Sequence, residues 1–553
     1  MLIGVLTGVV AGRMGPSCLG RMKARRFLAI VLAVALLLLG LGAAAWWLVL
    51  ARSPLQLQHQ PLAVPAAARF VPRQAPLSLF LFSDGEAPVA YARAVAPPRQ
   101  RAAATAAVAR LRDGAFAAAG LDYSSELRSW LGPEIGLALV AAGDPERPDG
   151  WLLTLRSRDA DGARRFLQRF WQTRSLAGTD LQISSYRGMG LISGRGALVG
   201  ADVVPIATAL INDDLVLIAS GRGVLEQALD VSQIDELNLA ASDAYRAGIT
   251  ALGDGVALLS ARPAALGTWL GIPLASIEQG AIGGLLAALR PVDSGLALEA
   301  AISRSGATAA EPSDWTITPQ ATSQAEALLS NLRGEADSLS VLQNPAALPE
   351  LLQPLLARAL SAAGSTLPAL VSAADAGPLL WAQAGGGWLL GTGTNQPPPA
   401  ALEPALAAEG LITAPLQLAD GRQVRVWTHL AAIGPRKGRS EAGQLQAELA
   451  GARASQGDLA WWSQTLARLE QQSEARQGPR RRLKQLEMLD RADAGVQWAA
   501  GPGQARELLR RWSSWRLLSG LAGEPLAEAA DGLALALTPE AGGYRLSARL
   551  DLA

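Results

Sequence analysis

The residue types that most often carry enzyme chemistry are scarce in this chain. Histidine occurs only at His59 and His429, and cysteine occurs only at Cys18. A Ser-His or Cys-His catalytic pair and most histidine metal sites therefore have no residues to build on. No Gly-x-Ser-x-Gly motif occurs, and neither Lys437 nor Lys484 completes a Ser-x-x-Lys motif. We therefore expect no catalytic site, no metal site and no cofactor.

Carboxylates are the remaining groups that could supply acid-base or metal chemistry. Asp159 and Asp161 form one close pair, and Asp213 and Asp214 form another. The first pair stands at a predicted helix start, where Asp is favoured as a cap, and the second lies in a predicted hairpin turn. Gly501–Gly503 precedes a predicted helix as phosphate loops do, but it has no lysine, so a tight turn is the simpler interpretation.

Aromatic residues are the strongest candidates for a binding surface. Tyr123 and Trp130 belong to a short predicted amphipathic helix that Gly132 ends, so they face either a partner or the core. Trp512 and Trp515 are three residues apart, so on a helix they would line one side of a pocket or a partner groove. Core packing is the competing interpretation for all four residues.

One dense basic run lies in the longest predicted helical stretch, 441–491. It consists of Arg480, Arg481, Arg482 and Lys484, and it could contact anionic lipid headgroups or simply form a solvated helix face. The whole chain has 49 basic and 48 acidic residues, a net charge of +1, so no overall field attracts nucleic acid. The candidate interaction surface therefore comprises Tyr123, Trp130, Trp512, Trp515, Arg480, Arg481 and Arg482.

Short apolar runs bounded by Gly, Asp or Pro predict the strands that must position these residues. The runs are Leu77–Phe82, Ile135–Ala141, Trp151–Arg156, Leu215–Ala219 and Val256–Ser260. Helical patterns lie between them, and in Asp161–Trp171 the apolar side chains fall on one face. Hairpins that alternate with helices favour mainly antiparallel sheets with covering helices, which is an α+β fold.

An internal repeat is the most informative pattern in the chain. Five segments of the first half recur in the same order in the second half, at offsets of 235 to 244 residues. The matched segments begin at Trp151 and Trp388, Asp180 and Pro415, Asp214 and Asp458, Asp254 and Ala494, and Ser294 and Asp531. Chance similarity between alanine- and leucine-rich strands is the alternative. We predict two duplicated α+β units at 77–310 and 311–553, because 553 residues exceed one hydrophobic core.

The stretch Phe27–Leu50 has no charged residue and is long enough to cross a bilayer as a single transmembrane helix. Basic residues cluster ahead of it, so the positive-inside rule predicts a cytoplasmic N-terminus, 1–26, and export of the rest. The segment 51–76 is rich in Pro, Gln and Ala, which predicts a tether. A cleaved signal peptide is the competing interpretation, and a start at Met22 would make 1–21 an upstream extension.

The stretch 120–136 reads Gly-Leu-Asp-Tyr-Ser-Ser-Glu-Leu-Arg-Ser-Trp-Leu-Gly-Pro-Glu-Ile-Gly and is preceded by Phe70-Val-Pro-Arg-Gln-Ala-Pro. Together with the helix Asp161–Trp171 and Tyr186-Arg-Gly, it resembles the cyanobacterial family of uncharacterised membrane-anchored proteins catalogued as a domain of unknown function. The resemblance covers most of the chain. It implies a cyanobacterial origin and an N-terminal anchor in the plasma or thylakoid membrane, and it carries over no activity.

These patterns predict a non-enzymatic binding or assembly protein, anchored by one span, whose body lies in the periplasm or the thylakoid lumen. Its expected partner is another envelope or lumenal protein, besides the membrane itself. One alternative is a carrier or sensor of an apolar ligand such as a lipid or pigment, suggested by the apolar content and the tryptophans. Another alternative is an enzyme with a site built from Asp, Glu, Arg and Tyr alone.

Overall fold

The structure is a computed structural model, which describes residues 53–553 with gaps at 141–149, 177–180, 197–203, 269, 272–281, 294, 307–314, 350–351, 354–355, 357–359, 361–365, 375–376, 386, 394–401, 419–420, 434–443 and 475–476. The predicted transmembrane segment Phe27–Leu50 and the N-terminal stretch 1–26 lie outside the described residues. Among the helices that are described, none is long and apolar enough to span a bilayer. The chain divides into Met1–Gln56 and Leu57–Ala553, and the following description concerns the second unit.

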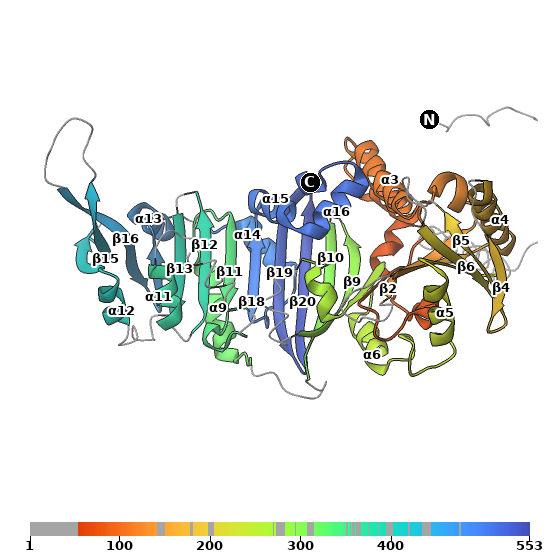
Figure 1. Ribbon diagram of the computed structural model, residues 1–553. Coiled ribbons are helices and arrows are strands. Elements are labelled where there is room, and N and C mark those ends of the chain that lie inside the picture. The colour runs from red at the N-terminus through yellow and green to blue at the C-terminus, as the bar shows by residue number, and fades with distance from the viewer. Residues whose placement is uncertain are drawn as a thin grey trace, which may run out of the picture. The chain divides into compact units, whose positions relative to one another are not determined.

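In the part of the chain that the structure describes, twenty strands form a single sheet, and their printed pairings are all antiparallel. Figure 1 shows the sheet running through both halves of the chain. Its first ten positions are, in order, β4 (Gln182–Tyr186), β5 (Met189–Gly196), β6 (Val204–Ile211), β7 (Leu215–Ala219), β3 (Gly150–Ser157), β2 (Leu131–Val140), β1 (Leu77–Leu81), β8 (Ala257–Ala261), β9 (Ile282–Val292) and β10 (Gly295–Arg304).

The sheet continues from β10 into the strands of the second half. These are, in order, β20 (Gly543–Leu552), β19 (Ala530–Glu540), β18 (Val496–Ala500), β11 (Ser338–Leu342), β12 (Leu379–Ala384), β13 (Gly387–Gly393), β17 (Leu459–Ser463), β16 (Gln444–Gln456), β15 (Gln423–Ile433) and β14 (Ile412–Gln417).

The predicted fold, two duplicated units of mainly antiparallel sheet, was therefore wrong, because the described strands form one sheet. β10 and β20 pair from Gly295 opposite Asp551 to Ser303 opposite Gly543, and this ladder joins the halves into one sheet. The physical reason is that a last strand leaves a row of backbone N–H and C=O groups without partners, and pairing with another edge satisfies them. Sequence patterns within either half carry no trace of this pairing.

The connectivity of the first ten strands repeats in the second ten. Read inward from each end, the order is β4-β5-β6-β7-β3-β2-β1-β8-β9-β10 in one half and β14-β15-β16-β17-β13-β12-β11-β18-β19-β20 in the other. Four of the five sequence matches join strands that are equivalent in this order, such as β3 with β13. The fifth joins β10 to β19, whose true counterpart is β9, because Gly-Leu-Ala-Leu occurs in both β10 and β19.

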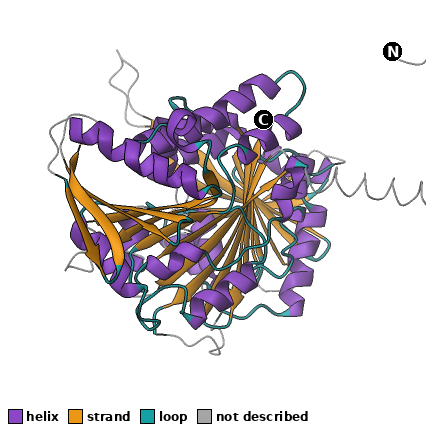
Figure 2. Cartoon of the chain, turned by 90° about the vertical axis from the view of Figure 1, so that its right-hand side faces the viewer, coloured by secondary structure: helices purple, strands orange, loops and turns teal. Residues whose placement is uncertain are grey.

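Helices cover both faces of the first half (Figure 2). Helices α5 (Arg222–Val231) and α6 (Asp243–Leu252) pack on one face, whereas α3 (Arg101–Ala118), α4 (Ala160–Leu176) and the turn η3 (Tyr123–Leu127) pack on the other. Alternate side chains of β7 serve the two faces: Leu217 joins the first cluster and Val216 joins the second. A strand buried on both faces reads as a continuous apolar run, which is why Leu215–Ala219 was recognised from the sequence.

The second half follows the same plan. Helices α9 (Pro319–Asn331), α13 (Leu466–Glu474) and α14 (Arg480–Glu487) lie on one face, and α11 (Leu367–Ala374) and α12 (Leu402–Ala408) lie on the other. In β17, Trp461 enters the first of these cores and its neighbour Trp462 the second. By connectivity α13 and α14 are the counterparts of α5 and α6. Helices α15 (Pro502–Arg511) and α16 (Ser513–Ala522) follow β18, and α16 contacts α3 of the first half.

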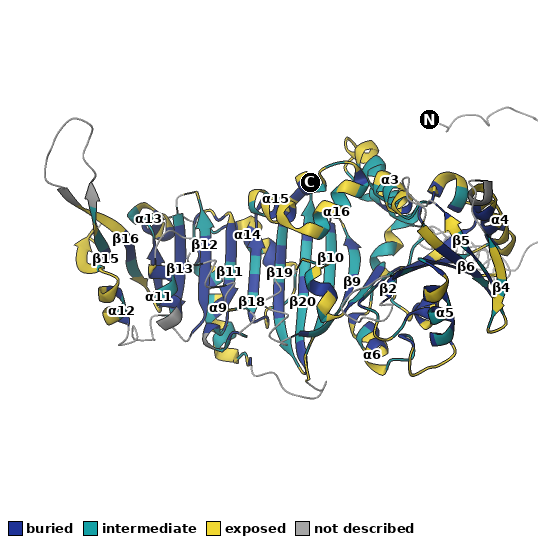
Figure 3. Cartoon of the chain, viewed as in Figure 1, coloured by how far each residue is buried: buried dark blue, intermediate teal, exposed yellow. Residues whose placement is uncertain are grey.

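The segment predicted to be a free tether, 51–76, packs against the sheet from Leu57 onward. Its helical turn η2 (Ala66–Phe70) places Ala67 and Ala68 at 0% exposure in the core beneath α5. The two ends of the sheet are more open (Figure 3). Every residue of the edge strand β14 is exposed, and Ile183 on the opposite edge strand β4 is 80% exposed.

Candidate functional site

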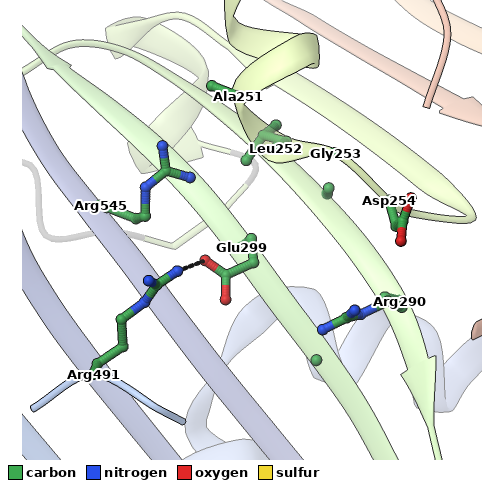
Figure 4. A pocket seen from close by; sticks show the side chains of 10 residues that line it. Ala251, Leu252, Gly253, Asp254, Arg290, Glu299, Arg491 and Arg545 are labelled. Atoms are coloured by element: carbon green, nitrogen blue, oxygen red, sulfur yellow. Dashed lines mark hydrogen bonds and ion pairs between the residues drawn. The ribbon is translucent and has the colours of Figure 1, made fainter. Parts of the chain in front are cut away.

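A cleft lies where the two halves of the sheet meet, and we call it the central cleft (Figure 4). It has a volume of about 310 Å³, at the lower end of the range of small-molecule sites. Strands β9, β10 and β20 form its floor, the end of α6 forms one wall, and the loop after α14 forms the other. Its lining residues are Ala251, Leu252, Gly253, Asp254, Ala288, Arg290, Ala297, Glu299, Arg491 and Arg545.

The register of the central strands explains why the floor is hollow. Ala288 of β9 lies opposite Glu299 of β10, which lies opposite Ser547 of β20. One step along the same face, Ala297 lies between Arg290 and Arg549. Alanine leaves space between the longer polar side chains. Among the described helices, α6 contacts β9 and β10, whereas α14 contacts β18 and β19.

Glu299 is the fixed centre of the site. Its Oε2 accepts a hydrogen bond of 2.8 Å from Ser547 Oγ and one of 3.2 Å from Arg491 Nη2. Arg491 Nε also donates to Ser547 Oγ at 2.9 Å, so the three side chains form a closed network. The Glu299 and Arg491 side chains are 26% and 33% exposed, which makes this pair only partly desolvated. Charge-assisted hydrogen bonds of this kind hold the Glu299 carboxylate in one orientation.

The Glu299–Ser547–Arg491 network lies where the two halves of the sheet meet. Glu299 is the fifth residue of β10, Ser547 is the fifth residue of β20, and the two strands are equivalent. Since these two residues also face each other in the ladder, the pairing is what a twofold axis between the halves would produce. Sites at the interface of two folded halves are a common location for ligands.

The remaining charges of the cleft fall into two groups. Arg545 pairs with Glu540 through its Nε, so its charge is compensated within β19 and β20. Arg290 and Asp254, in contrast, form no ion pair and no side-chain hydrogen bond with any residue that the structure describes. Both are partly exposed and both face the cleft (Figure 4).

Glu299 accepts hydrogen bonds from both Ser547 and Arg491. In the described part of the chain, no three His, Cys, Asp or Glu side chains are grouped to hold a metal ion. The site offers a floor with charged groups held at fixed positions.

The structure places Tyr123 and Trp130 in the core, so neither presents a surface to a partner. Tyr123 is 4% exposed, stacks on Phe116 at 5.5 Å between centroids, and lies under the Arg112 guanidinium, 4.0 Å from it. Trp130 is 1% exposed, and its Nε1 donates to the carbonyl oxygen of Glu126 at 2.7 Å. Core packing, the competing interpretation, describes both.

The other predicted interaction residues lie apart from the central cleft. Trp512 is 40% exposed between α15 and α16, and its ring stacks on Trp515 at 6.5 Å between centroids. Of the basic run on α14, Arg480 and Arg481 are exposed, whereas Arg482 is 5% exposed and donates to Gln485. Burial lowers the pKa of the Arg482 guanidinium, so this residue serves the interior rather than a surface.

The acidic pairs lie at the helix start and in the hairpin turn where they were predicted, and their side chains form ion pairs there. Asp159 pairs with Arg165 of α4 at 3.3 Å, and Asp161 pairs with Arg164 at 3.0 Å. Asp213 has a φ of 61° in the turn between β6 and β7 and pairs with Arg164. The Gly501–Gly503 turn begins α15, and the Gly501 N–H donates to the Asp337 carbonyl at 2.7 Å.

Sequence reasoning missed Arg290, Glu299, Arg491 and Arg545. One signal was available: Glu299 is the only charged residue in the otherwise apolar stretch 295–302, which becomes most of β10. A carboxylate in the middle of an apolar strand needs a partner, because burying an unpaired charge is costly. The partner could not be found from the residues near Glu299 in the sequence, because Arg491 lies 192 residues further along the chain.

The model of one protein family matches residues 31–541, which is most of the chain. The protein belongs to the family described as "Protein of unknown function (DUF3352)". The predicted membership of a family of unknown function is thereby confirmed, while the cyanobacterial origin and the membrane anchor stay predictions. The family description assigns no activity.

No curated protein matches the chain. Two solved structures are similar to it. "Structure of crystal form III of TP0453" is 10% identical, with a TM-score of 0.26, and covers 48% of this chain and 86% of its own. "Structure of crystal form I of TP0453" is 10% identical, with a TM-score of 0.24, and covers 49% of this chain and 88% of its own. Likeness at this level carries no functional argument.

Proposed function

We propose that the protein is a non-enzymatic binding protein that holds a small polar ligand in the central cleft between its two halves. The observation that carries this proposal is the Glu299–Ser547–Arg491 network, which fixes a carboxylate and a guanidinium on the floor of a cleft built from both halves. Groups held in advance cost little ordering entropy when a ligand binds. The uncompensated Arg290 and Asp254 on the same cleft supply further contacts.

The alternative of an apolar ligand receives less support from the geometry. Four tryptophans of the second half pack against one another: Trp381 stacks on Trp388 at 5.7 Å and Trp427 on Trp462 at 5.0 Å between centroids. All four are 5% exposed or less and belong to one core cluster. They stabilise the second half of the sheet, whereas the central cleft is lined by five charged side chains.

We also propose that the folded body acts outside the cytoplasm. The support for this proposal is the cluster of basic residues ahead of the apolar stretch Phe27–Leu50, a pattern that directs export of the chain that follows. Protease digestion of intact and lysed spheroplasts tests it. The body should be cleaved in intact spheroplasts, and protection that is lost only on lysis would contradict export.

Native mass spectrometry of the full chain, extracted gently from its own cells, tests the binding proposal. The wild-type protein should carry a low-mass ligand at one copy per chain. Ala297→Phe, which fills the floor of the cleft, should remove this ligand, and the matched control Ala297→Ser should keep it. Unchanged circular dichroism and melting temperature must show that both variants fold. A wild-type protein with no ligand, or equal retention by Ala297→Phe, would refute the proposal.

A further inference from the structure

The charges around the central cleft can be assigned to partners one by one. Arg491 is compensated by Glu299, at 3.2 Å between Nη2 and Oε2. Arg545 is compensated by Glu540, which lies just outside the cleft. Arg549, on the same face of β20, is compensated by Asp551 at 2.9 Å. In these pairs each of the three arginines is matched by one carboxylate.

Two lining groups remain, and they have opposite signs. Neither Arg290 nor Asp254 forms an ion pair with any described residue, so both charged groups are open to a ligand. Arg290 lies on β9, and Asp254 lies just before β8, the neighbouring strand. They occupy the same side of the cleft (Figure 4).

The backbone around Asp254 is held from both sides. The Leu62 N–H donates to the Gly253 carbonyl at 2.9 Å, and the Gly255 N–H donates to the Gln60 carbonyl at 2.8 Å. Arg290 is held by the ladder of β9 with β10, where it lies opposite Ala297. Two opposite charges are therefore presented from fixed backbone positions, with the apolar surface of Leu252, Ala288 and Ala297 beside them.

We infer that the ligand of the central cleft is a small zwitterion, whose acidic group pairs with Arg290 and whose ammonium group pairs with Asp254. This inference rests on the proposed function and specifies its ligand class. An anion alone would satisfy Arg290 but would leave Asp254 uncompensated beside it, and a cation alone would do the reverse. A guanidinium donates hydrogen bonds to a carboxylate or to a phosphate, so a free amino acid and a zwitterionic lipid headgroup share the required chemistry.

Isothermal titration calorimetry with the full chain tests this inference. Leucine represents a free amino acid, and glycerophosphoethanolamine represents a lipid headgroup without its chains. The matched controls are 4-methylpentanoate, which is leucine without its amino group, and 3-methylbutylamine, which is leucine without its carboxylate. At least one zwitterion should bind about tenfold or more tightly than either single-charge control, because each charge-assisted contact is worth about a factor of ten. The zwitterion that binds identifies the source.

Two substitutions locate the binding groups. Arg290→Gln and Asp254→Asn should each weaken zwitterion binding by about tenfold or more, and Asp254→Asn should reduce the preference for the zwitterion over 4-methylpentanoate. The exposed residues Arg516 and Asp458 provide matched controls of the same charge changes, and Arg516→Gln and Asp458→Asn should leave binding unchanged.

The outcomes separate the two proposals. Binding of a single-charge control as tightly as its zwitterion, or binding that survives both cleft substitutions, overturns the zwitterion. A low-mass ligand that native mass spectrometry finds in the wild-type protein, and that carries one charge or none, also overturns it but leaves the proposed function in place. If the wild-type protein retains no ligand and neither zwitterion gives a heat of binding, both the proposed function and the zwitterion inference are refuted.

Discussion

The joint between the halves can be tested at two equivalent glycines. Gly295 begins β10 and Gly543 begins β20, and each lies against the far end of the other strand. A Cβ added at Gly295 would lie inside van der Waals contact of the Leu550 carbonyl oxygen. A Cβ at Gly543 would meet the Ile302 carbonyl oxygen in the same way. In both cases the obstacle is backbone, which cannot rotate away.

The expected loss of stability follows from these contacts. Forcing an extra carbon into a packed site costs about 1–3 kcal/mol. Replacing glycine by alanine returns about 0.4–1 kcal/mol by restricting the unfolded chain. We therefore expect Gly295→Ala and Gly543→Ala each to lower the free energy of unfolding by about 1–2 kcal/mol. Gly503 of α15 is the matched control, because its added Cβ would meet nothing within 4 Å, and alanine there favours the helix.

Urea unfolding, followed by tryptophan fluorescence, measures the change. The midpoint should fall for Gly295→Ala and Gly543→Ala at an unchanged slope, and it should stay constant or rise for Gly503→Ala. If both substitutions were as harmless as Gly503→Ala, β10 and β20 would not pair as described and the single sheet would be wrong at its centre. If only one were harmful, the equivalence of the two strands would fail.

Three further outcomes test the core and its titrating groups. Trp130→Ala should cost about 3–5 kcal/mol of stability by urea unfolding, while Trp512→Ala, at a site 40% exposed, should cost far less; similar losses would contradict the burial of Trp130. Hydrogen bonds from Ser125 and Ser124 lower the pKa of Asp122 to about 2, so its stabilisation is present above pH 4 and lost as the pH falls toward 2. Asp122→Ala should therefore lower the melting temperature at pH 7 but not at pH 2, and an equal loss at both would refute that. Burial raises the pKa of Tyr123 to about 12. The stability that the protonated phenol contributes is therefore present below pH 10 and is lost as the pH rises toward 12. In Tyr123→Phe the melting temperature should therefore fall less between pH 10 and pH 12 than in the wild-type protein. An equal fall would show that Tyr123 does not cause it.

Local patterns predicted the strands and the repeat, because an apolar run depends only on residues that are close together in the sequence. Leu215–Ala219 is apolar throughout, since both faces of β7 are covered, and its counterpart in the second half carries Trp461 and Trp462. The same patterns could not reveal the joint between β10 and β20, whose paired residues lie about 250 positions apart. The segment Ala66–Phe70 was also misjudged, because an alanine-rich turn has no periodicity that distinguishes burial from exposure.

The candidate site was less accessible to prediction than the fold. Its hollow depends on Ala288 and Ala297, which resemble the many other alanines of the sequence until the register places them between Arg290, Glu299 and Arg549. The tryptophans were misleading as candidate surface residues for a related reason. A large aromatic side chain is as useful to the interior as to a surface, and Trp130 lies in the interior.

The pairing of β10 with its own counterpart β20 makes the joint isologous: each half contributes the same edge. Isologous contacts are closed: once two copies have paired, the edge of each copy is occupied and no further copy can pair there. A third copy of the ten-strand unit would find no β10-type edge free. A chain with a single unit should instead assemble this sheet as a homodimer, and fusion of two copies would replace a concentration-dependent association by an intramolecular one.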